Sequence, residues 1–450
     1  MVNNYDVIII GAGLSGVYCA SLLKKYGLKI AVLESSPRIG GRLKSIRDDK
    51  GGYELGGTYI GNSYQRVINV ANRIGLELID VSNLLSFFKQ QDLVIDGEII
   101  AQKEWPSHKK NILDSKLKHI MPWNLHRTLL KKHNPFNTTE ACLGDMSFKD
   151  CSMGDWLRSL NFNEKEIRII YGMNVSYGCN AEDISLLQLL HRSTFSSVQS
   201  NKTKQSGLTL KKGMTSLVEG LVAENNLEIF LNHKVTDISN ESNHYLIKSN
   251  NITIKANHLV VTVPPACIKS ISLKNVIPER LLAILKTLIS QPMIQVHFKV
   301  KHPFWENDNY APSLFSNELF GMCHEVRHLN NPEEIKGLTS WVMGEQAKKL
   351  LKFSPQEAAK IILNQYNLIR PSSKNNIEIS TIAPWSHDEN FQGGWVYFQP
   401  NGFKAFHEEL KKLDSRFCLA GEYTAKAARG MEGAMESGEA AAEKIISQLY

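Results

Sequence analysis

Three glycines near the start of the chain have the spacing that accommodates a diphosphate. The stretch "YDVIIIGAGLSG" is an apolar, β-branched run that ends at Gly11, and Gly13 and Gly16 complete the pattern G-x-G-x-x-G. Gly11 allows a tight turn, Gly13 lets the backbone approach a pyrophosphate, and Gly16 permits close packing of the next helix on the strand. The N-terminus of that helix, at Leu14 and Ser15, then faces the anion.

An acid follows at the distance that an adenine dinucleotide requires. "KIAVLE" is a second short apolar strand, and Glu34 ends it about twenty residues after the glycine turn, with Ser35 beside it. A carboxylate in this place accepts hydrogen bonds from ribose hydroxyls and disfavours a phosphorylated ribose. Strand, turn, helix, strand and acid in this order predict a bound adenine dinucleotide.

The composition is that of an ordinary globular protein. The chain has 450 residues, of which 42% are hydrophobic and 22% charged, and this length predicts two domains. The net charge of +7 is scattered along the chain, so we expect no nucleic acid partner. The seven cysteines are far apart and form no CxxC pair, which indicates a reducing compartment.

We expect neither a targeting segment nor a membrane span. Residues 2–6 are polar and lead straight into the first strand, and no run of about 18 apolar residues occurs. No metal-ligand spacing is visible, and His191 and His297 are interpreted as core or rim residues rather than as bases. The sequence thus predicts a soluble, cytoplasmic protein without a metal site.

The residues after the acid favour a flavin over a nicotinamide. A second loop of glycines and arginines, "SSPRIGGRLKSI", follows directly, and "YELGGTYIG" comes next. A nicotinamide dehydrogenase has no need of this loop. A protein that encloses FAD uses it to cap the diphosphate and to lead the chain under the isoalloxazine ring, so the sequence favours FAD.

At this point the sequence resembles the flavin-containing amine oxidase family, which includes monoamine oxidases, polyamine oxidases and L-amino-acid oxidases. The resemblance runs from end to end and rests on landmarks that occur in family order: "RIGGR", "ELGGTYIG", "GMTSLVEGL", "HKVTDI", "HLVVTVPP", "FKVKHPFW" and "CLAGEYTAKAARGMEGAMESGEAAAEKI". The resemblance implies noncovalent FAD, a two-domain fold and oxidation of the substrate by hydride loss to the flavin.

The resemblance also implies which residues contact the cofactor. The family pattern assigns to the FAD site the loop residues Gly41, Arg42 and Leu43, the ring-side residues Gly57 and Thr58, Val235 beside the adenine, Trp385 beside the flavin, Glu422 near the ribityl chain and diphosphate, and Gly430 and Met431 where the final helix begins. The N-terminus of that helix points at the flavin pyrimidine, where negative charge develops on reduction.

The coarse pattern of the chain indicates how the domains are made. A strand–helix–strand beginning precedes a mostly helical part from about 80 to 200, an antiparallel meander from about 228 to 263, a mixed region, and a closing strand and Gly/Ala-rich helix. We predict an α/β fold. Its Rossmann-like FAD-binding domain is assembled from the three segments 1–79, 204–283 and 391–450, and its α+β substrate-binding domain is formed by the two insertions 80–203 and 284–390.

Two positions depart from the family pattern. Alignment on "HPFW" puts Gln295 where amine oxidases commonly carry a lysine that is linked through water to flavin N5. Glutamine holds a water but supplies no positive charge and no base. Lys299 is reached only by a register shift that brings it too close to "PFW". Trp395 replaces the flavin-linking cysteine of monoamine oxidases; it or Tyr397 forms one wall of the aromatic slot, and the other wall, at Gly430, is missing.

We therefore expect an FAD-dependent oxidoreductase that removes hydride from the α-carbon of an amine and leaves an imine, which water hydrolyses. Gln295 and Trp395 are the predicted catalytic residues, and oxygen or another electron acceptor reoxidises the flavin. An L-amino-acid oxidase is less favoured, because no arginine could be placed against a carboxylate. The alternatives are a desaturase that acts on carbon–carbon bonds and a flavin-binding protein without turnover. The oligomeric state is open, with a homodimer as one possibility.

Overall fold

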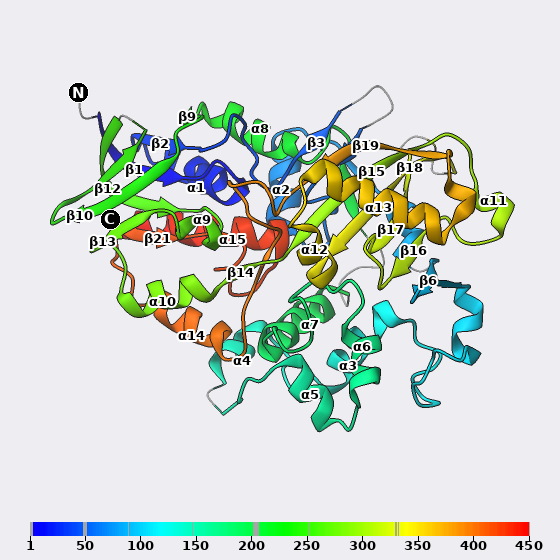
Figure 1. Cartoon of the computed structure of the whole chain (residues 1–450). Coiled ribbons are helices and arrows are strands. Elements are labelled where there is room, and N and C mark those ends of the chain that lie inside the picture. The colour runs from blue at the N-terminus through cyan, green and yellow to red at the C-terminus, as the bar shows by residue number, and fades with distance from the viewer. Residues whose placement is uncertain are drawn as a thin grey trace.

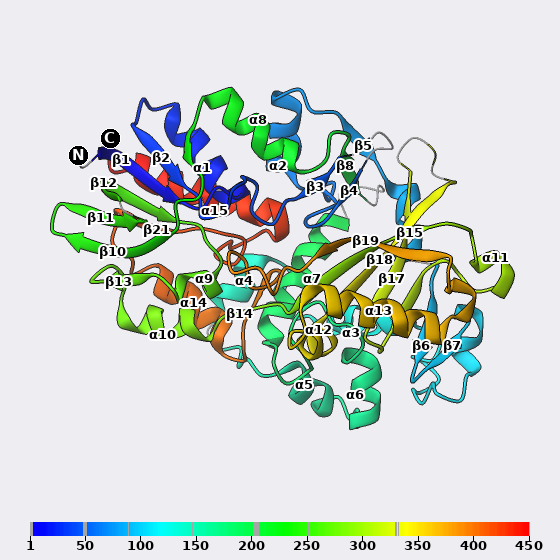
Figure 2. The same ribbon diagram turned by 45° about the horizontal axis from the view of Figure 1, so that its top comes forward.

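Two large β-sheets and the helices around them form the molecule (Figures 1 and 2). The computed structural model describes residues 3–47, 52–88, 90–145, 147–200, 207–250, 252–328, 331 and 333–449. Within these residues no helix has the length and apolar character needed to cross a membrane. The same residues contain no group of three or more His, Cys, Asp or Glu side chains placed to hold a metal ion.

The first sheet carries the glycine turn. Its eight strands are ordered β13-β10-β11-β12-β1-β2-β9, and β21 also pairs with β12. Their bounds are β1 (Asn3–Ile10), β2 (Ile30–Leu33), β9 (Glu228–Phe230), β10 (Val235–Glu241), β11 (His244–Ser249), β12 (Ile252–Val261), β13 (Ser272–Lys274) and β21 (Phe417–Leu419). Strands β9, β2, β1, β12 and β21 run parallel, whereas β10, β11 and β12 form an antiparallel meander. The predicted α/β fold is confirmed.

One strand of the predicted meander lies elsewhere. Residues of β9 pair in parallel with β2, at the opposite edge of the sheet from β10. Strand β2 would otherwise present a row of unpaired backbone groups at the edge of the sheet, and β9 satisfies them. Alternation of apolar and polar residues does not tell which neighbour a short strand chooses.

Three helices cover one face of this sheet: α1 (Leu14–Lys24), α8 (Thr215–Asn225) and α15 (Gly430–Ile446). Helices α1 and α15 pack very closely, because a Cβ at Gly438 would lie 2.4 Å from the carbonyl oxygen of Ser15. The hydroxyl of Ser437 also lies 3.1 Å from that of Ser15. The first turn of α1 is thereby held against the middle of α15.

The second sheet has seven strands in the order β19-β15-β18-β17-β16-β6-β7. Their bounds are β6 (Asp92–Ile95), β7 (Glu98–Ile100), β15 (Met293–Val300), β16 (Leu314–Ser316), β17 (Met322–Arg327), β18 (Ile335–Met343) and β19 (Ile377–Ala383). Helix α13 (Pro355–Ile369) lies against this sheet, with Ile362 and Tyr366 in one buried cluster with Phe298 of β15.

Strands β6 and β7 form a hairpin inside the part of the chain that we expected to be mostly helical. The turn is made by Asp96 and Gly97, whose φ angles are 49° and 77°. Two positive φ angles in a two-residue loop are typical of hairpin turns, and Asp-Gly between apolar runs is a strong signal for one. The stretch "LVIDGEII" carried this signal, and the overall helical pattern around it concealed it.

The helices of the middle part form a layer beside the second sheet (Figure 2). They are α3 (Pro122–His133), α4 (Thr139–Gly144), α5 (Met153–Ser159), α6 (Glu164–Tyr171) and α7 (Leu186–Ser200). Helix α3 packs against both α6 and α7. The division into FAD-binding and substrate-binding domains stays a prediction.

Short elements connect these parts. They are β3 (Ser45–Ile46), β4 (Tyr53–Glu54), α2 (Gln65–Arg73), β5 (Leu78–Asp80), η1 (Ser82–Phe88), η2 (Gln102–Ser107), β8 (Leu208–Leu210), α9 (Pro265–Ile268), α10 (Glu279–Thr287), β14 (Ile289–Ser290), α11 (Trp305–Asp308), α12 (Gly344–Leu350), η3 (Pro371–Ser373), β20 (Val396–Tyr397) and α14 (Gly402–Leu410).

Candidate functional site

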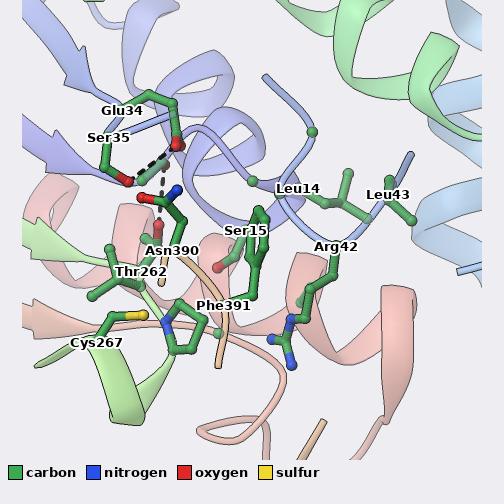
Figure 3. Close-up of a pocket in the computed structure, with 18 of the residues that line it drawn as sticks. Leu14, Ser15, Glu34, Ser35, Arg42, Leu43, Thr262, Cys267, Asn390 and Phe391 are labelled. Carbon is green, nitrogen blue, oxygen red and sulfur yellow. Dashed lines mark hydrogen bonds between the residues drawn. The ribbon is translucent and has the colours of Figure 1, made fainter. Parts of the chain in front are cut away.

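A cavity of about 250 Å³ opens at the carboxyl ends of β1 and β2 (Figure 3). Strand β1 lies between β2, which follows it in the chain, and β12, which comes from a distant segment. Parallel sheets with crossover helices bind ligands at the carboxyl ends of strands where the strand order reverses in this way. All of the predicted cofactor residues line this cavity except Gly16 and Thr58. The structure thus brings together positions from both ends and the middle of the chain.

The two glycine loops lie against each other at the cavity wall. The N–H of Gly40 donates to the carbonyl of Ala12 at 2.9 Å, and a Cβ at Gly41 would lie 3.1 Å from the Cα of Gly13. A side chain at Gly41 would therefore push the loops apart, whereas a Cβ at Gly13 would lie in ordinary contact, 3.8 Å from the Cα of Gly41. Gly16 lies behind the turn, where a Cβ would be 2.1 Å from the carbonyl oxygen of Gly11, so its role is close packing.

Glu34 is held rigidly beside the glycine turn. One carboxylate oxygen accepts the N–H of Ala12 at 2.8 Å, and the other accepts the N–H of Ser36 at 2.8 Å and the hydroxyl of Ser35 at 3.4 Å. A carboxylate has about four acceptor positions, so one is left for a ribose hydroxyl. Figure 3 shows Glu34 and Ser35 at one end of the group of lining side chains, with Arg42 at the other.

Two helix N-termini face this cavity without a side-chain cap. Helix α1 begins after Gly13 and α15 begins after Arg429, and neither N-cap side chain accepts a hydrogen bond from the first turn. Leu14, Ser15 and Met431 line the cavity. The free N–H groups and the positive end of each helix dipole suit a ligand with negative charge at two places, as a diphosphate and a reduced flavin have.

Arg42 and Glu422 connect three separate segments at the cavity. Arg42 donates to the carbonyl of Gly394 at 2.6 Å, and its guanidinium lies 3.5 Å from a carboxylate oxygen of Glu422. The same oxygen of Glu422 accepts the N–H of Val396 at 2.9 Å. The arginine side chain keeps 28% of its surface exposed, so its charge is available to a diphosphate.

Carboxylates fix the N-terminal end of α15 to its surroundings. Glu432 is buried and accepts the backbone N–H groups of Arg66 and Val67, in the first turn of α2; burial raises its pKa. Glu436 accepts the N–H groups of Lys426, Ala427 and Ala428 in the loop before the helix. This loop and α2 therefore keep a fixed position relative to the first turn of α15.

A second cavity, of about 360 Å³, adjoins the first. Trp395, Glu422 and Gly430 line both cavities, so these residues form the common wall. Helices α3, α6 and α7 and strands β17 and β18 supply much of the remaining wall. Its aromatic lining consists of Tyr64, Trp123, Tyr177, Phe195, Phe315, Trp341 and Trp395. A cavity of this size with seven aromatic side chains in its lining suits a small organic substrate.

Of the two residues predicted for the aromatic wall, only Trp395 lines the cavities. Trp395 donates its indole N–H to the carbonyl of Ser176, and its ring lies 5.8 Å from that of Tyr177. Tyr397 is buried and lines neither cavity. Sequence reasoning missed Tyr64, whose hydroxyl would lie 3.3 Å from a Cβ at Gly430. Tyr64 therefore stands close to the place where a side chain at Gly430 would form the missing wall.

Gln295 lines neither cavity. Its amide donates to the carbonyl of Glu54 at 3.2 Å and lies 2.9 Å from Nε2 of His297. Burial lowers the pKa of His297 to about 3, so the ring is neutral and accepts this hydrogen bond. Glu54 begins the segment that was predicted to pass beside the flavin, so Gln295 supports it from behind. Its catalytic role stays a prediction.

His191 is neutral, and both of its ring nitrogens are hydrogen-bonded. Its Nε2–H donates to the carbonyl of Lys426 at 2.7 Å, and its Nδ1 accepts from Arg429 at 3.0 Å. Burial, and then the charge of Arg429, lower its pKa to about 2. It therefore has no free nitrogen with which to act as a base.

Several lining residues of the first cavity were not predicted as site residues. Thr262 donates its hydroxyl to the carbonyls of Ile10 and Gly11, and Cys267 and Phe391 lie nearby (Figure 3). Thr262 lies within the landmark "HLVVTVPP" and was detectable there. Nothing in the local sequence of Cys267 or Phe391 indicates a ligand.

Comparison with known proteins identifies the family and its cofactor. A family model described as "Flavin containing amine oxidoreductase" matches residues 14–446. The chain belongs to this family. It is a flavin-dependent amine oxidoreductase, and its cofactor is FAD. The first cavity fits this cofactor, because it combines a glycine cradle, two uncapped helix N-termini, an arginine and a carboxylate.

Individual relatives are similar over nearly the whole chain. Amine oxidase [flavin-containing] B of Bos taurus is 23% identical over 480 residues, which cover 100% of this chain and 87% of that protein. Probable flavin-containing monoamine oxidase A of Dictyostelium discoideum is 23% identical, with 99% and 98% covered.

Solved structures share the fold. A triple mutant of putrescine oxidase superposes with a TM-score of 0.79 at 20% identity and covers 100% of both chains. Cyclohexylamine oxidase from Brevibacterium oxydans IH-35A gives a TM-score of 0.77 at 19% identity and covers 99% of both chains.

Proposed function

We propose that this enzyme oxidises a small amine that binds in the second cavity, next to FAD in the first. The observation that carries this proposal is the common wall of Trp395, Glu422 and Gly430. Gly430 has no side chain, so it places no side-chain atoms between the two spaces. When bound, FAD accepts hydride from the α-carbon of the amine, and the resulting imine is hydrolysed by water.

The chain's own residues bind and orient both partners. Gly13 and Gly41 let the diphosphate approach, the first turns of α1 and α15 donate N–H groups, and Glu34 binds a ribose. Trp395 and Tyr64 flank the amine with aromatic faces and exclude water from it. Similar proteins bear the names of monoamine, putrescine and cyclohexylamine oxidases, which supports an amine substrate.

The flavin is held noncovalently in this proposal. Trp395 stands at the position of the flavin-linking cysteine of monoamine oxidases and forms no such bond. Cys267 lines the first cavity, but burial raises the pKa of its thiol to about 11, so the reactive thiolate is scarce. Denaturation should therefore release all of the FAD from the protein.

Anaerobic reduction tests the proposal. The FAD-loaded protein is mixed with a panel of amines without oxygen, and the visible absorption of the oxidised flavin is followed. We expect one or more amines to bleach it and to yield one carbonyl product per flavin. A desaturated product with no carbonyl would favour a carbon–carbon desaturase instead. No bleaching by any amine would contradict the proposal.

The electron acceptor, a homodimeric state and a cytoplasmic location stay predictions. Oxygen, or another small acceptor, must remove two electrons from the reduced flavin to complete each turnover.

A further inference from the structure

The second cavity holds a cluster of positive charge. Three arginines line it, Arg127 of α3, Arg192 of α7 and Arg429 before α15, and Glu422 is the one carboxylate among its described lining residues. Glu422 is paired with Arg42 and accepts the N–H of Val396. It is thus already neutralised from the side of the first cavity.

Arg429 is already hydrogen-bonded within the protein. Its guanidinium donates to the carbonyls of Ala425 and Ala428 at 3.0 and 3.2 Å and to His191 at 3.0 Å. It also lies over the ring of Phe403, 5.3 Å from the centroid. These contacts hold the loop before α15 in place and leave Arg127 and Arg192 as the cations available to a ligand.

Neither Arg127 nor Arg192 has a carboxylate partner among the residues that the structure describes. Arg192 donates to the hydroxyl of Tyr177 and lies over its ring, 4.6 Å from the centroid. The side chain of Arg127 makes no hydrogen bond or ion pair within the described residues. Arg127 keeps more than a third of its surface exposed, so its guanidinium is accessible to a ligand. Desolvation by its neighbours, and then the nearby charge of Arg192, still lower the pKa of Arg127.

Arg127 and Arg192 carry like charges in the lining of the same cavity and repel each other, and an anion between them would relieve the repulsion. Arginine presents paired N–H groups that match a carboxylate, and the bonds formed are strong because both partners are charged. The indole N–H groups of Trp123 and Trp341, residues that also line the cavity, have no acceptor among the residues that the structure describes. The lining therefore has surplus donors and positive charge.

His126 is uncharged, so the positive charge of the lining comes from the arginines alone. It lies edge-to-face with Tyr171, and burial, together with Arg127 and Arg192, lowers its pKa to about 3. No unpaired carboxylate of the described lining could receive a second ammonium group. A diamine would place that group against guanidinium ions.

We infer that the amine substrate of this enzyme carries an anionic group, in the simplest case a carboxylate, which Arg127 and Arg192 bind. The inference rests on the proposed function for the amine itself. It reverses the sequence-based preference against an amino acid, which depended on the lack of an arginine to place against a carboxylate. The two arginines come from separate helices, α3 and α7, that meet only in the folded protein.

Calorimetric titration of the FAD-loaded protein tests the inference without turnover. The ligands are phenylacetate, phenylacetamide and phenethylamine, which share a ring and differ in charge. We expect phenylacetate to bind more tightly than the other two. Arg127→Gln and Arg192→Gln should each weaken phenylacetate binding by about 10- to 100-fold, since a hydrogen bond to a charged group contributes roughly 1.5–3 kcal/mol. Phenylacetamide binding should change little.

Two variants serve as controls. Lys131→Gln removes one positive charge from an exposed position of the same helix as Arg127, outside the cavity lining, and should leave phenylacetate binding unchanged. Arg127→Lys keeps the charge but loses the paired N–H groups, so it should restore part of the affinity. If a glutamine variant fails to fold, the comparison of phenylacetate with phenylacetamide on the unmodified protein still decides.

The outcomes separate this inference from the proposed function. Equal affinity for phenylacetate and phenylacetamide, or unchanged phenylacetate binding in Arg127→Gln and Arg192→Gln, would overturn the anion site even if simple amines bleach the flavin. Arginine-dependent binding of phenylacetate in a protein whose flavin no amine bleaches would support the anion site and contradict amine oxidation. Faster anaerobic bleaching by phenylalanine or an ω-amino acid than by the matching uncharged amine supports both.

Discussion

Gly16 offers a direct test of how the fold presents the cofactor-binding turn. An alanine Cβ at this position would lie 2.1 Å from the carbonyl oxygen of Gly11 and 2.9 Å from the hydroxyl of Thr262. Real Cβ atoms essentially never come closer than 3.0 Å to another heavy atom, so α1 must move away from the turn by roughly 1 Å in Gly16→Ala. Overpacking of this kind costs about 1–3 kcal/mol of stability.

The displacement should also weaken FAD binding. The first turn of α1 contributes N–H groups at Leu14 and Ser15 to the cavity, and a shift of about 1 Å spoils one of their hydrogen bonds to the diphosphate. Loss of one bond to a charged group costs about 1.5–3 kcal/mol, which raises the Kd of FAD roughly 10- to 100-fold. Titration of the apoprotein with FAD, followed by quenching of flavin fluorescence, measures this change.

Gly144→Ala is the matched control. A Cβ at Gly144, where α4 ends, meets no atom within 4 Å, so this substitution should leave FAD affinity unchanged. If Gly16→Ala binds FAD as tightly as the unmodified protein, close packing of α1 on the turn is not required and the reasoning fails. An equal loss in both variants would show a general destabilisation instead.

Three further predictions concern other parts of the molecule. Glu34→Gln keeps the shape of the side chain but removes its charge, so the Kd of FAD should rise about tenfold or more by the same titration; an unchanged Kd would remove Glu34 from the ribose site. His407 is buried with neither ring nitrogen hydrogen-bonded within the described residues, and burial lowers its pKa from 6.5 to about 3. Below pH 6.5 the histidine therefore binds a proton in the unfolded chain but not in the folded protein. The free energy of unfolding falls as the pH falls, and at about pH 5.5 the loss from one such histidine is about 1.4 kcal/mol. Urea unfolding at pH 7 and at about pH 5.5 measures this loss, and His407→Leu should lose less unfolding free energy between these pH values than the unmodified protein. Equal losses in the two proteins would contradict a neutral, buried His407. Gln295 supplies no positive charge near the flavin, so stopped-flow mixing of the reduced enzyme with oxygen should show slow reoxidation; fast reoxidation would argue against it.

The sequence predicted those parts of the site that lie within one local unit. The turn at Gly11, Gly13 and Gly16 needs only the strand before it and the helix after it, and Glu34 ends the next strand. The structure places each of these residues where the spacing required. Even the indirect role of Gly16, in packing rather than in lining the cavity, follows from its place in the pattern.

Contacts between distant segments were not predictable in the same way. Arg127 and Arg192 lie on the helices α3 and α7, and only the packing of these helices brings both side chains to one cavity. Tyr64 approaches Gly430 because Glu432 receives the first backbone N–H groups of α2. A single sequence shows neither relation, because no spacing or residue pattern connects the partners.

The choice between neighbouring residues also needed the structure. Trp395 and Tyr397 are two positions apart, and alternation alone places them on the same face of an extended segment. Trp395 comes just before β20 and faces both cavities, whereas Tyr397 lies within β20 and packs in the core.

A crystal structure of the protein with FAD tests the central claim most directly. We expect the adenosine end beside Glu34 and Val235, the diphosphate between the first turn of α1 and Arg42, and the isoalloxazine ring at the common wall of Trp395, Glu422 and Gly430. A flavin ring that lies outside both cavities, or one separated from the second cavity by the protein, would contradict the account.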